Sequence, residues 1–594
     1  MTEICKQTHD NFKDRNSVAI NKSKTRNNPT VEWNKINWRR AERLTFKLQK
    51  RIYQASERGD VKAVRKLQKT LINSGSNKVL AVRRVTQDNT GKRTAGVDGI
   101  KLLTPKQRIK LVSQLKTTGK SQPTRRVRIP KPGSNESRHL GIPTMYDRAL
   151  QAVVKAGLEP EWEAKLEPNS FGFRPGRSCH DAIGAIFDSI RYKAKYVLDA
   201  DIAKCFDRIN HKALLDKINT YPRLRKQIKS WLKSGVLDQG EIFPTDKGTP
   251  QGGVISPLLA NIALHGMEER VKQYAETLTE GYLGINKRDK RASLSLIRYA
   301  DDFVIMHKDI DVVTTCQKII AEWLGDIGLE LKPSKTKLTH TLNEYNGNVG
   351  FEFLGFHIQQ HKVGNYRSAR STKGIPLGFK TLITPSKPKI KAHLSRIAEV
   401  IDTHNATPQA ALISRLNPII RGWSKYYSTV VSKEIFVKVD NLIYDKLRAW
   451  AKRRGKGSIN KDKYWRTVGN RNWCFSTEDG CELSQHSATP IVRHAKVKGN
   501  STPYNGDWIY WSKRRGEYPE TPTRVATLLK KQKGKCTHCG LYFTPTDTVE
   551  VDHIQPRSLS GKGEYINLQL LHKHCHDTKT ENDGSFKGYN DNPF

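Results

Sequence analysis

Two adjacent carboxylates, Asp301 and Asp302, lie between two short apolar runs of this chain. Such runs around a tight turn predict a β-hairpin with the acids at its tip. Neighbouring strand residues point to opposite faces and adjacent acids repel each other, so at most one acid could easily be a buried structural partner. A divalent cation would relieve that repulsion. A solvated Asp-Asp turn is the ordinary alternative, and the rest of the chain decides between them.

A third carboxylate, Asp201, ends an apolar run that begins at Tyr196. This pattern predicts a strand that could place a metal ligand at its end, whereas a helix N-cap or a surface acid is the alternative. Asp201, Asp301 and Asp302 together are the ligands that nucleotidyl transfer by two Mg²⁺ ions needs. Two such ions, roughly 3.5–4 Å apart, activate an attacking 3′-hydroxyl and stabilise the leaving pyrophosphate.

The tail of the chain carries a different group of ligands. Cys536 and Cys539 form one pair, and His572 and Cys575 form a second. Two such pairs predict a tetrahedral structural Zn²⁺ site, with His574 or His538 as possible substitutes for His572. The alternative is a set of reduced thiols and imidazoles at the surface.

The composition indicates the class of partner. At 594 residues, the chain is long enough for several domains of about 150 residues each. Lys and Arg number 104 against 58 Asp and Glu, a net charge of +46, which a nucleic-acid partner would neutralise. An anionic membrane is the rival, but no apolar run is long enough to span one. The N-terminus has no signal-peptide core, and most cysteines are scattered singly, so we expect a cytosolic protein without a membrane partner.

The elements that must position these residues form a multidomain α+β chain. The N-terminal part is polar up to residue 31, which predicts an arm that is disordered or ordered by RNA, and two amphipathic basic helices follow. Mixed strands and helices come next, then an all-helical segment, then the tail. The predicted divisions are an N-terminal, RNA-binding extension over 1–90, an α+β unit over 91–385, a helical domain over 386–455, an aromatic and basic region over 456–525, and a tail domain over 526–594.

The region over 456–525 interleaves aromatic residues with bases. Aromatic rings can stack on bases while cations contact phosphates, although most such rings are core residues. We expect a minority of this set to contact nucleic acid. The aromatic residues are Tyr464, Trp465, Trp473, Trp508, Tyr510 and Trp511.

Several short motifs, taken in order, resemble those of the reverse transcriptases. They are Asp-Ile-Ala-Lys-Cys-Phe-Asp at 201–207, Pro-Gln-Gly at 250–252, Tyr-Ala-Asp-Asp at 299–302, Leu-Lys-Pro-Ser-Lys at 331–335 and Phe-Leu-Gly-Phe at 353–356. The resemblance narrows to the multifunctional proteins encoded by mobile group II introns. The segments that carry it are 128–131, 138–144, 147–151, 170–176 and the helical stretch 416–427.

This resemblance implies a right-hand polymerase, with fingers and palm over 91–385 and an α-helical thumb or maturase domain over 386–455. A DNA-binding region and a small zinc-containing ββα-metal (HNH) nuclease domain would follow. The resemblance makes Asp201, Asp301 and Asp302 the catalytic acids of the polymerase. It makes Phe206 the aromatic residue that excludes a ribose 2′-hydroxyl, and Gln251 a residue that lines the nucleotide pocket. Lys131 and Arg138 would bind the incoming triphosphate.

The tail resembles the HNH nucleases. The resemblance makes His553 the general base, Asp552 and His576 the ligands of one catalytic Mg²⁺, and Asn567 the residue that positions the turn after His553. One departure is His572, which stands where a cysteine is common in this family.

The implied function combines several activities. The protein would bind its group II intron RNA, promote splicing as a maturase, and enter a ribonucleoprotein that recognises target DNA. The nuclease would nick one strand, and the polymerase would copy an RNA template from a DNA primer with dNTPs, two Mg²⁺ in the polymerase site and one in the nuclease site. The expected location is cytoplasmic, in a bacterial-type or organellar setting near the nucleoid. The alternatives are an RNA-binding splicing cofactor with inactive sites and, less favoured, a reverse transcriptase of host defence.

Overall fold

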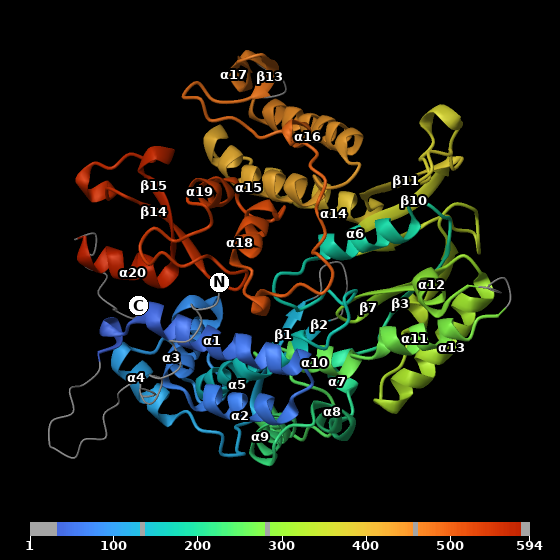
Figure 1. Cartoon of the computed structure of the whole chain (residues 1–594). Helices are drawn as coiled ribbons and strands as arrows, with labels where there is room; N and C mark the ends of the chain where they lie inside the picture. Colours follow the sequence, from blue (N-terminus) through green and yellow to red (C-terminus); the bar gives the residue numbers. More distant parts are fainter. Residues whose placement is uncertain (1–31, 131–136, 280–284, 456–460, 584–594) are drawn as a thin grey trace, which may run out of the picture.

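The computed structural model describes residues 32–130, 137–279, 285–455 and 461–583 (Figure 1). Lys131 and the predicted arm up to residue 31 lie outside these ranges. Within them, none of the helices combines the length and apolar character needed to cross a membrane.

The first described part is a group of helices. Asp60 begins the second helix as its N-cap by accepting a hydrogen bond from the Ala63 amide at 2.9 Å. The apolar faces of the first two helices meet in a small core that contains Ile52 and Leu71. The helices of this group are α1 (Trp38–Glu57), α2 (Val61–Asn73), α3 (Gly75–Arg83), α4 (Pro105–Gln114) and α5 (Met145–Glu163).

Two four-stranded sheets follow. The first has the order β2-β1-β4-β5, and the second has the order β6-β7-β3-β8 with β3 and β7 at its centre. The first comprises β1 (Thr124–Pro130), β2 (Ser137–Ile142), β4 (Val236–Asp238) and β5 (Glu241–Phe243); the second comprises β3 (Tyr196–Asp201), β6 (Ser295–Tyr299), β7 (Asp302–His307) and β8 (Lys337–His340). The hairpin predicted around Asp301 and Asp302 is confirmed, because β6 and β7 pair with Tyr299 opposite Asp302.

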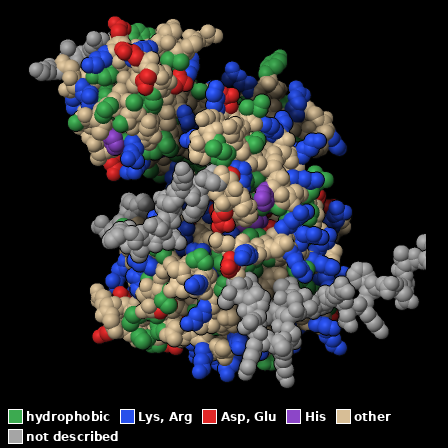
Figure 2. Space-filling view, turned by 90° about the vertical axis from the view of Figure 1, so that its left-hand side faces the viewer, with side chains coloured by type: hydrophobic (Ala, Val, Ile, Leu, Met, Phe, Trp, Pro, Cys, Tyr) green, Lys and Arg blue, Asp and Glu red, His purple; other side chains and the backbone are tan. Residues whose placement is uncertain are grey.

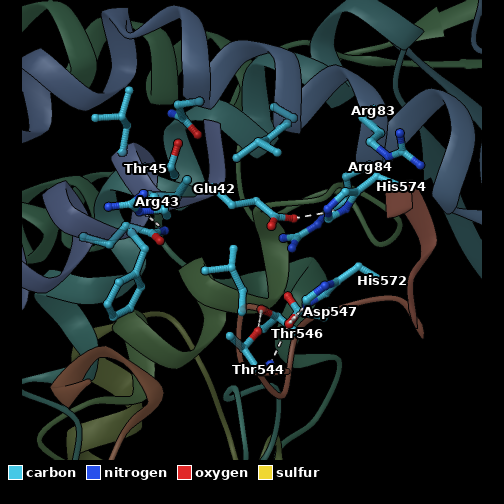
Figure 3. A pocket seen from close by; sticks show the side chains of 18 of the residues that line it. Glu42, Arg43, Thr45, Arg83, Arg84, Thr544, Thr546, Asp547, His572 and His574 are labelled. Carbon is cyan, nitrogen blue, oxygen red and sulfur yellow. Dashed lines mark hydrogen bonds and ion pairs between the residues drawn. The ribbon is translucent and has the colours of Figure 1, made fainter. Parts of the chain in front are cut away.

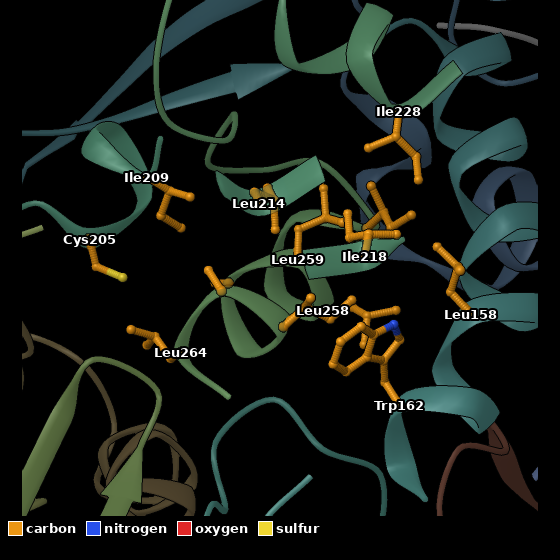
Figure 4. Packing of buried hydrophobic residues seen from close by; sticks show 14 of the residues in the cluster. Leu158, Trp162, Cys205, Ile209, Leu214, Ile218, Ile228, Leu258, Leu259 and Leu264 are labelled. Atoms are coloured by element: carbon orange, nitrogen blue, oxygen red, sulfur yellow. The ribbon is translucent and has the colours of Figure 1, made fainter. Parts of the chain in front are cut away.

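Helices bury the apolar side chains of this part in one large core. Leu258, Leu259 and Leu264 of α10 lie among apolar side chains from α5, α8 and α9 (Figure 4). Burying each such side chain contributes about 1.5–3 kcal/mol, so this core fixes the strands that carry the acids. The helices are α6 (Cys179–Ile190), α7 (Cys205–Arg208), α8 (His211–Ile218), α9 (Pro222–Leu232), α10 (Ser256–Leu264), α11 (Met267–Glu276), α12 (Lys287–Ser293) and α13 (Ile310–Asp326).

A three-stranded sheet joins this part to the helical domain. Leu412, Leu416 and Ile420, which recur at helical spacing, are buried in a separate core of that domain. The strands are β9 (Phe351–Phe353), β10 (Phe356–Lys362) and β11 (Phe379–Pro385), and the helices are α14 (Lys387–Thr403), α15 (Gln409–Tyr427) and α16 (Lys433–Arg454).

The aromatic and basic region divides into two parts. Residues Tyr464 and Trp465 are buried against the helical domain, and the chain then returns to the palm, where Trp511 is fully buried (Figure 1). Trp473 is 55% exposed. Tyr464, Trp465 and Trp511, half of the aromatic set, are therefore core residues, and contact of the others with nucleic acid stays a prediction. The elements are α17 (Lys461–Tyr464), β12 (Trp465–Val468), β13 (Arg471–Phe475) and α18 (Trp508–Glu517).

The tail folds as a small unit with a ββα arrangement. β14 (Val549–His553) and β15 (Leu568–His572) form an antiparallel pair, and α20 (Lys573–Asn582) follows directly. α19 (Thr523–Lys531) leads into the unit. The predicted ββα fold of the tail is therefore present.

Candidate active sites

The three predicted polymerase acids lie at one edge of the palm sheet. Asp201 is the last residue of β3 and pairs with Asp302, the first residue of β7. Directly opposed residues of an antiparallel pair share a face, so these two carboxylates are neighbours. Asp301 lies in the adjoining turn, where its carbonyl accepts a hydrogen bond from the Ile202 amide at 3.3 Å. The fold thus gathers carboxylates that lie about a hundred positions apart in the chain.

The carboxylates repel one another. Burial, together with the charges of Asp301 and Asp201, raises the pKa of Asp302 to about 6. Burial also raises the pKa of Asp301. A fourth acid that the sequence analysis missed, Asp199, lies two residues before Asp201 on the same face of β3, and burial beside Asp302 raises its pKa to about 7. Carboxylate oxygens are the ligands that a hard divalent cation prefers, and such an ion would relieve the repulsion between these acids.

Lys335 supplies positive charge at the same edge. Its ammonium donates a hydrogen bond to Asp201 Oδ2 at 2.5 Å, which raises the pKa of Lys335. Lys335 is the last residue of the Leu-Lys-Pro-Ser-Lys motif, which by itself implied no role for it. The structure makes it a direct neighbour of a predicted metal ligand.

A buried arginine holds the turn that carries Asp301. Arg298 is only 2% exposed, and its guanidinium donates to the Ala300 carbonyl at 3.0 Å. It also donates to Asn261 at 3.1 Å and to Ser170 at 2.7 Å. Ala300 has a φ of 59°, a conformation that costs energy in a non-glycine residue. Arg298 therefore stabilises a strained turn through its backbone.

Gly172 lies directly against this turn, and we predict that Gly172→Ala impairs the polymerase site. A Cβ at this position would lie 2.3 Å from the Ala300 nitrogen, so the turn would have to move. A displacement near 1 Å costs about 10²-fold in rate, and we expect that loss in kcat for primer extension. Gly184→Ala is the matched control, since its Cβ would meet nothing closer than 3.5 Å. Equal rates for both variants would contradict a positioning role for this contact.

Three of the four predicted nucleotide-binding residues lie in the part of the chain that the structure describes. The Phe206 carbonyl accepts a hydrogen bond from the Thr249 amide at 2.6 Å, which ties the Pro-Gln-Gly loop to α7. Gln251 Nε2 lies 3.5 Å from Asp207 Oδ1. Arg138 is exposed on β2, and its charge lowers the pKa of Asp301 against the larger effect of burial. Of these residues, Arg138 is close enough for its charge to act on Asp301, Gln251 lies beside Asp207, and Lys131 lies outside the described residues.

The predicted nuclease residues converge in the tail. Asp552 Oδ1 lies 3.7 Å from His576 Nε2, so one cation could contact both groups. Arg557 Nε donates to His553 Nε2 at 3.2 Å, so this nitrogen carries the lone pair that a general base needs.

Asn567 fixes the chain after His553. Its side chain accepts from the Gln555 amide at 2.8 Å and donates to the Gln555 carbonyl at 3.1 Å and the Lys562 carbonyl at 2.9 Å. This is the geometry expected of a residue that positions the turn.

The four predicted zinc ligands come together. The ligand atoms of Cys536, Cys539, His572 and Cys575 all lie within 4.8 Å of one another, and all four residues are buried. His538 is exposed, whereas His574 turns its Nδ1 towards Glu42 at 3.3 Å. Of His538, His572 and His574, it is therefore His572 whose ring nitrogen lies close to the three thiols.

Asp547 orients the histidine of this cluster. His572 Nδ1 faces Cys539 Sγ at 3.4 Å, while His572 Nε2 faces Asp547 Oδ2 at 3.4 Å. A carboxylate on the far nitrogen of a metal-binding histidine is a common supporting contact. The sequence analysis missed Asp547, because a lone aspartate on a loop carries no local signal.

The tail domain is docked on the N-terminal helices. Arg83 of α3 donates to Asp577 of α20 at 2.6 Å, and Glu42 of α1 points towards His574 (Figure 3). A cavity of about 1190 Å³ lies beside these contacts and is lined by residues of α1, α3, α5 and the tail. The tail domain is thus held against the N-terminal helices through α20.

Lys and Arg side chains are frequent on the face of the molecule that Figure 2 shows. Lys and Arg side chains are spread over the upper and the lower parts of the face in Figure 2. With the net charge of +46, this surface fits a polyanionic partner.

Comparison with protein families gives four matches along the chain. Residues 33–115 match the N-terminal domain of reverse transcriptase, and 129–358 match the reverse transcriptase (RNA-dependent DNA polymerase) family. Residues 390–468 match the maturase-specific domain of group II introns, and 536–582 match the HNH endonucleases. The mixed α/β fold that carries the acids is therefore a reverse transcriptase fold, and the tail is an HNH domain.

Individual relatives agree with these matches. Group II intron-encoded protein LtrA of Lactococcus lactis subsp. cremoris is 31% identical over 341 residues, covering 48% of this chain and 55% of that protein. The chain thus matches little more than half the length of this relative. Protein YkfC of Escherichia coli (strain K12) is 30% identical over 333 residues, covering 49% of this chain and 83% of that protein.

A solved structure of apo telomerase from Candida Tropicalis aligns with a TM-score of 0.30 and 15% identity over 40% of this chain and 53% of that chain, which is too weak to argue from. The resemblance inferred from the motifs is nevertheless confirmed by the family matches and the relatives. On these grounds the chain belongs to the family of group II intron-encoded proteins.

Proposed function

We propose that the protein is an RNA-directed DNA polymerase, a maturase for its intron RNA and an HNH DNA endonuclease that together serve intron mobility. The observation that carries this proposal is the convergence of Asp201, Asp301 and Asp302 at one sheet edge. A protein that only binds RNA gains nothing from three carboxylates that repel one another. The predicted divisions of the chain are part of this proposal: N-terminal extension, fingers and palm, thumb, DNA-binding region and nuclease.

In the polymerase, Asp201, Asp301 and Asp302 would hold two Mg²⁺. When bound, these ions would lower the pKa of the primer 3′-hydroxyl and neutralise the leaving pyrophosphate. Phe206 would exclude a ribose 2′-hydroxyl, Gln251 would line the nucleotide pocket, and Lys131 and Arg138 would bind the triphosphate of a dNTP. The partners would be an RNA template and a DNA primer.

In the nuclease, Asp552 and His576 would hold one Mg²⁺, which would stabilise charge on the phosphate. His553 would accept a proton from the attacking water at Nε2. Arg557 now donates to that nitrogen, and an incoming phosphate would draw the guanidinium to itself and free the base. Asn567 would keep His553 in position through the Gln555 contacts.

As a maturase, the protein would bind intron RNA through its N-terminal extension and helical domain. Contacts with phosphates would dominate, so affinity should fall steeply with salt. With excised RNA, the complex would recognise target DNA mostly by base pairing, helped by the region over 456–525. Its place of action would be the cytoplasm or organelle that holds the intron's DNA.

The proposal is tested by reconstituting the protein with RNA of the intron that encodes it and adding duplex DNA of the insertion site. We expect accelerated splicing, nicking of one DNA strand, and cDNA that begins at the nick. Splicing without nicking or cDNA, from folded protein, would favour the alternative of a splicing cofactor with inactive sites.

A structural Zn²⁺ would be held by Cys536, Cys539, His572 and Cys575, and it would fix the nuclease fold. We predict that Asp547→Asn weakens zinc binding by about 10–100-fold, because Asp547 orients His572. Competition with a chelator would measure the affinity, with exposed Glu564→Gln in the same domain as the control. An unchanged affinity would show that Asp547 does not support the ligand.

A further inference from the structure

A second cluster of metal-ligating side chains lies outside both candidate active sites. It comprises Cys179 and His180 at the start of α6 and Glu520 in the connection before α19. Cys179 is 8% exposed and His180 is 2% exposed, whereas Glu520 is at the surface. One ligand atom from each residue lies within 4.8 Å of the others. The proposed polymerase, maturase and nuclease roles use none of the three.

The spacing of the buried pair is that of two ligands on one tetrahedral ion. Cys179 Sγ lies 3.5 Å from His180 Nδ1, close to the 3.4 Å between Cys539 Sγ and His572 Nδ1 in the tail cluster. An ion about 2.3 Å from a thiolate and about 2.0 Å from an imidazole separates the two ligand atoms by roughly 3.5 Å. The distance between Cys179 Sγ and His180 Nδ1 therefore already suits such an ion.

The tautomer of His180 also suits a ligand. His180 Nε2 lies 2.8 Å from the Tyr426 carbonyl, which can only accept, so Nε2 carries the hydrogen. In the neutral ring, the lone pair is then on Nδ1, the atom that faces Cys179. Metal-binding histidines commonly donate their other N–H to a backbone carbonyl in this way.

We propose that Cys179, His180 and Glu520 form a second Zn²⁺ site, with its fourth position open to water. A thiolate, an imidazole and a carboxylate favour Zn²⁺ over Mg²⁺, which prefers oxygen ligands. Binding would release the Cys179 proton to solvent. The ordinary alternative is a thiol that shares hydrogen bonds with His180 and with the Tyr426 hydroxyl at 3.2 Å, beside an unrelated surface acid.

The site would join three parts of the chain. α6 belongs to the palm, Tyr426 belongs to α15 of the helical domain, and Glu520 lies just before α19, which leads into the nuclease domain. Zinc bound here would fix the segment around Glu520, which leads to the nuclease domain, against α6 and the adjoining end of α15. This inference does not depend on the proposed activities, because metal content is measured without them.

The test uses the full-length protein, stripped with a chelator, reloaded with Zn²⁺ alone, desalted and analysed by mass spectrometry of the metal. The decisive quantity is the difference in zinc content per protein chain between wild type and Cys179→Ala. Zinc bound by the tail cluster is present in both proteins and does not change this difference. We expect a loss of one equivalent. Cys316→Ala is the matched control, because Cys316 is a buried cysteine outside both ligand clusters, and it should keep the wild-type content.

A surface variant covers the case in which Cys179→Ala does not fold. Glu520→Gln changes an exposed side chain and should weaken the binding of one zinc equivalent by about tenfold or more, while the exposed neighbour Glu517→Gln should not. Equal zinc content in wild type and Cys179→Ala would overturn the site, and equal affinity for Glu520→Gln would remove Glu520 from it.

Discussion

Replacing Asp301 by Ala is expected to abolish RNA-templated DNA synthesis while leaving intron RNA binding and splicing assistance intact. The loss should be about 10³-fold or more, because a metal ligand supports several kcal/mol of transition-state stabilisation. Asp301 lies in the turn beside Asp201 and Asp302, outside the segment of the helical domain. Steady-state primer extension and a splicing assay on the same preparation would measure both roles.

The control for this variant is Asp311→Asn, which alters an exposed carboxylate in the first turn of α13. It should synthesise cDNA at the wild-type rate. If Asp301→Ala lost splicing assistance together with polymerisation, the proposed separation of the two roles would be wrong.

Replacing His553 by Ala should stop DNA nicking and leave polymerisation unchanged. General-base catalysis contributes typically about 10²–10⁴-fold, and we expect a loss of this size. The polymerase is expected to be unaffected because the palm acids lie on a separate sheet from the β14–β15 pair. Nicking of a labelled duplex by the ribonucleoprotein, with extension of a pre-nicked duplex in parallel, separates the two activities.

His538→Ala is the matched control, because His538 is an exposed histidine of the same domain. A His553→Ala variant that nicks at the rate of this control would remove His553 as the base. Loss of nicking in both variants would point instead to damage of the domain.

The sequence predicts the local parts of the polymerase site well. The hairpin around Asp301 and Asp302 follows from two apolar runs and a turn. Such a local pattern predicts structure well because it depends on neighbouring residues and not on distant segments. Asp199 could have been found by the same reasoning, since it shares a strand face with Asp201 two residues later. The alternation of side chains along β3 was available without any structure.

The supporting contacts could not be predicted, because they join distant segments. Arg298 binds Ser170 and Asn261, which lie far away in the chain, and no local pattern marks its guanidinium as buried. Arg83 and Asp577 are separated by 494 positions. Such pairs depend on how whole domains pack, which composition and periodicity do not determine.

In the region over 456–525, the composition did not reveal which aromatic residues are buried and which are accessible to nucleic acid. Trp465 and Trp511 are buried, whereas Trp473 is 55% exposed, although all three lie among similar basic residues. Stacking on nucleic acid and packing in a core favour the same aromatic side chains, so residue type alone cannot separate them. The structure selects Trp473 as the tryptophan of these three that is accessible to a partner.

The most direct test of the central claim is extension of a labelled DNA primer on an RNA template by the purified wild-type protein with Mg²⁺ and dNTPs. The convergence of Asp201, Asp301 and Asp302 predicts full-length cDNA that disappears when Mg²⁺ is chelated. Absence of extension by folded protein that still binds RNA would contradict the polymerase and leave the splicing cofactor as the better account.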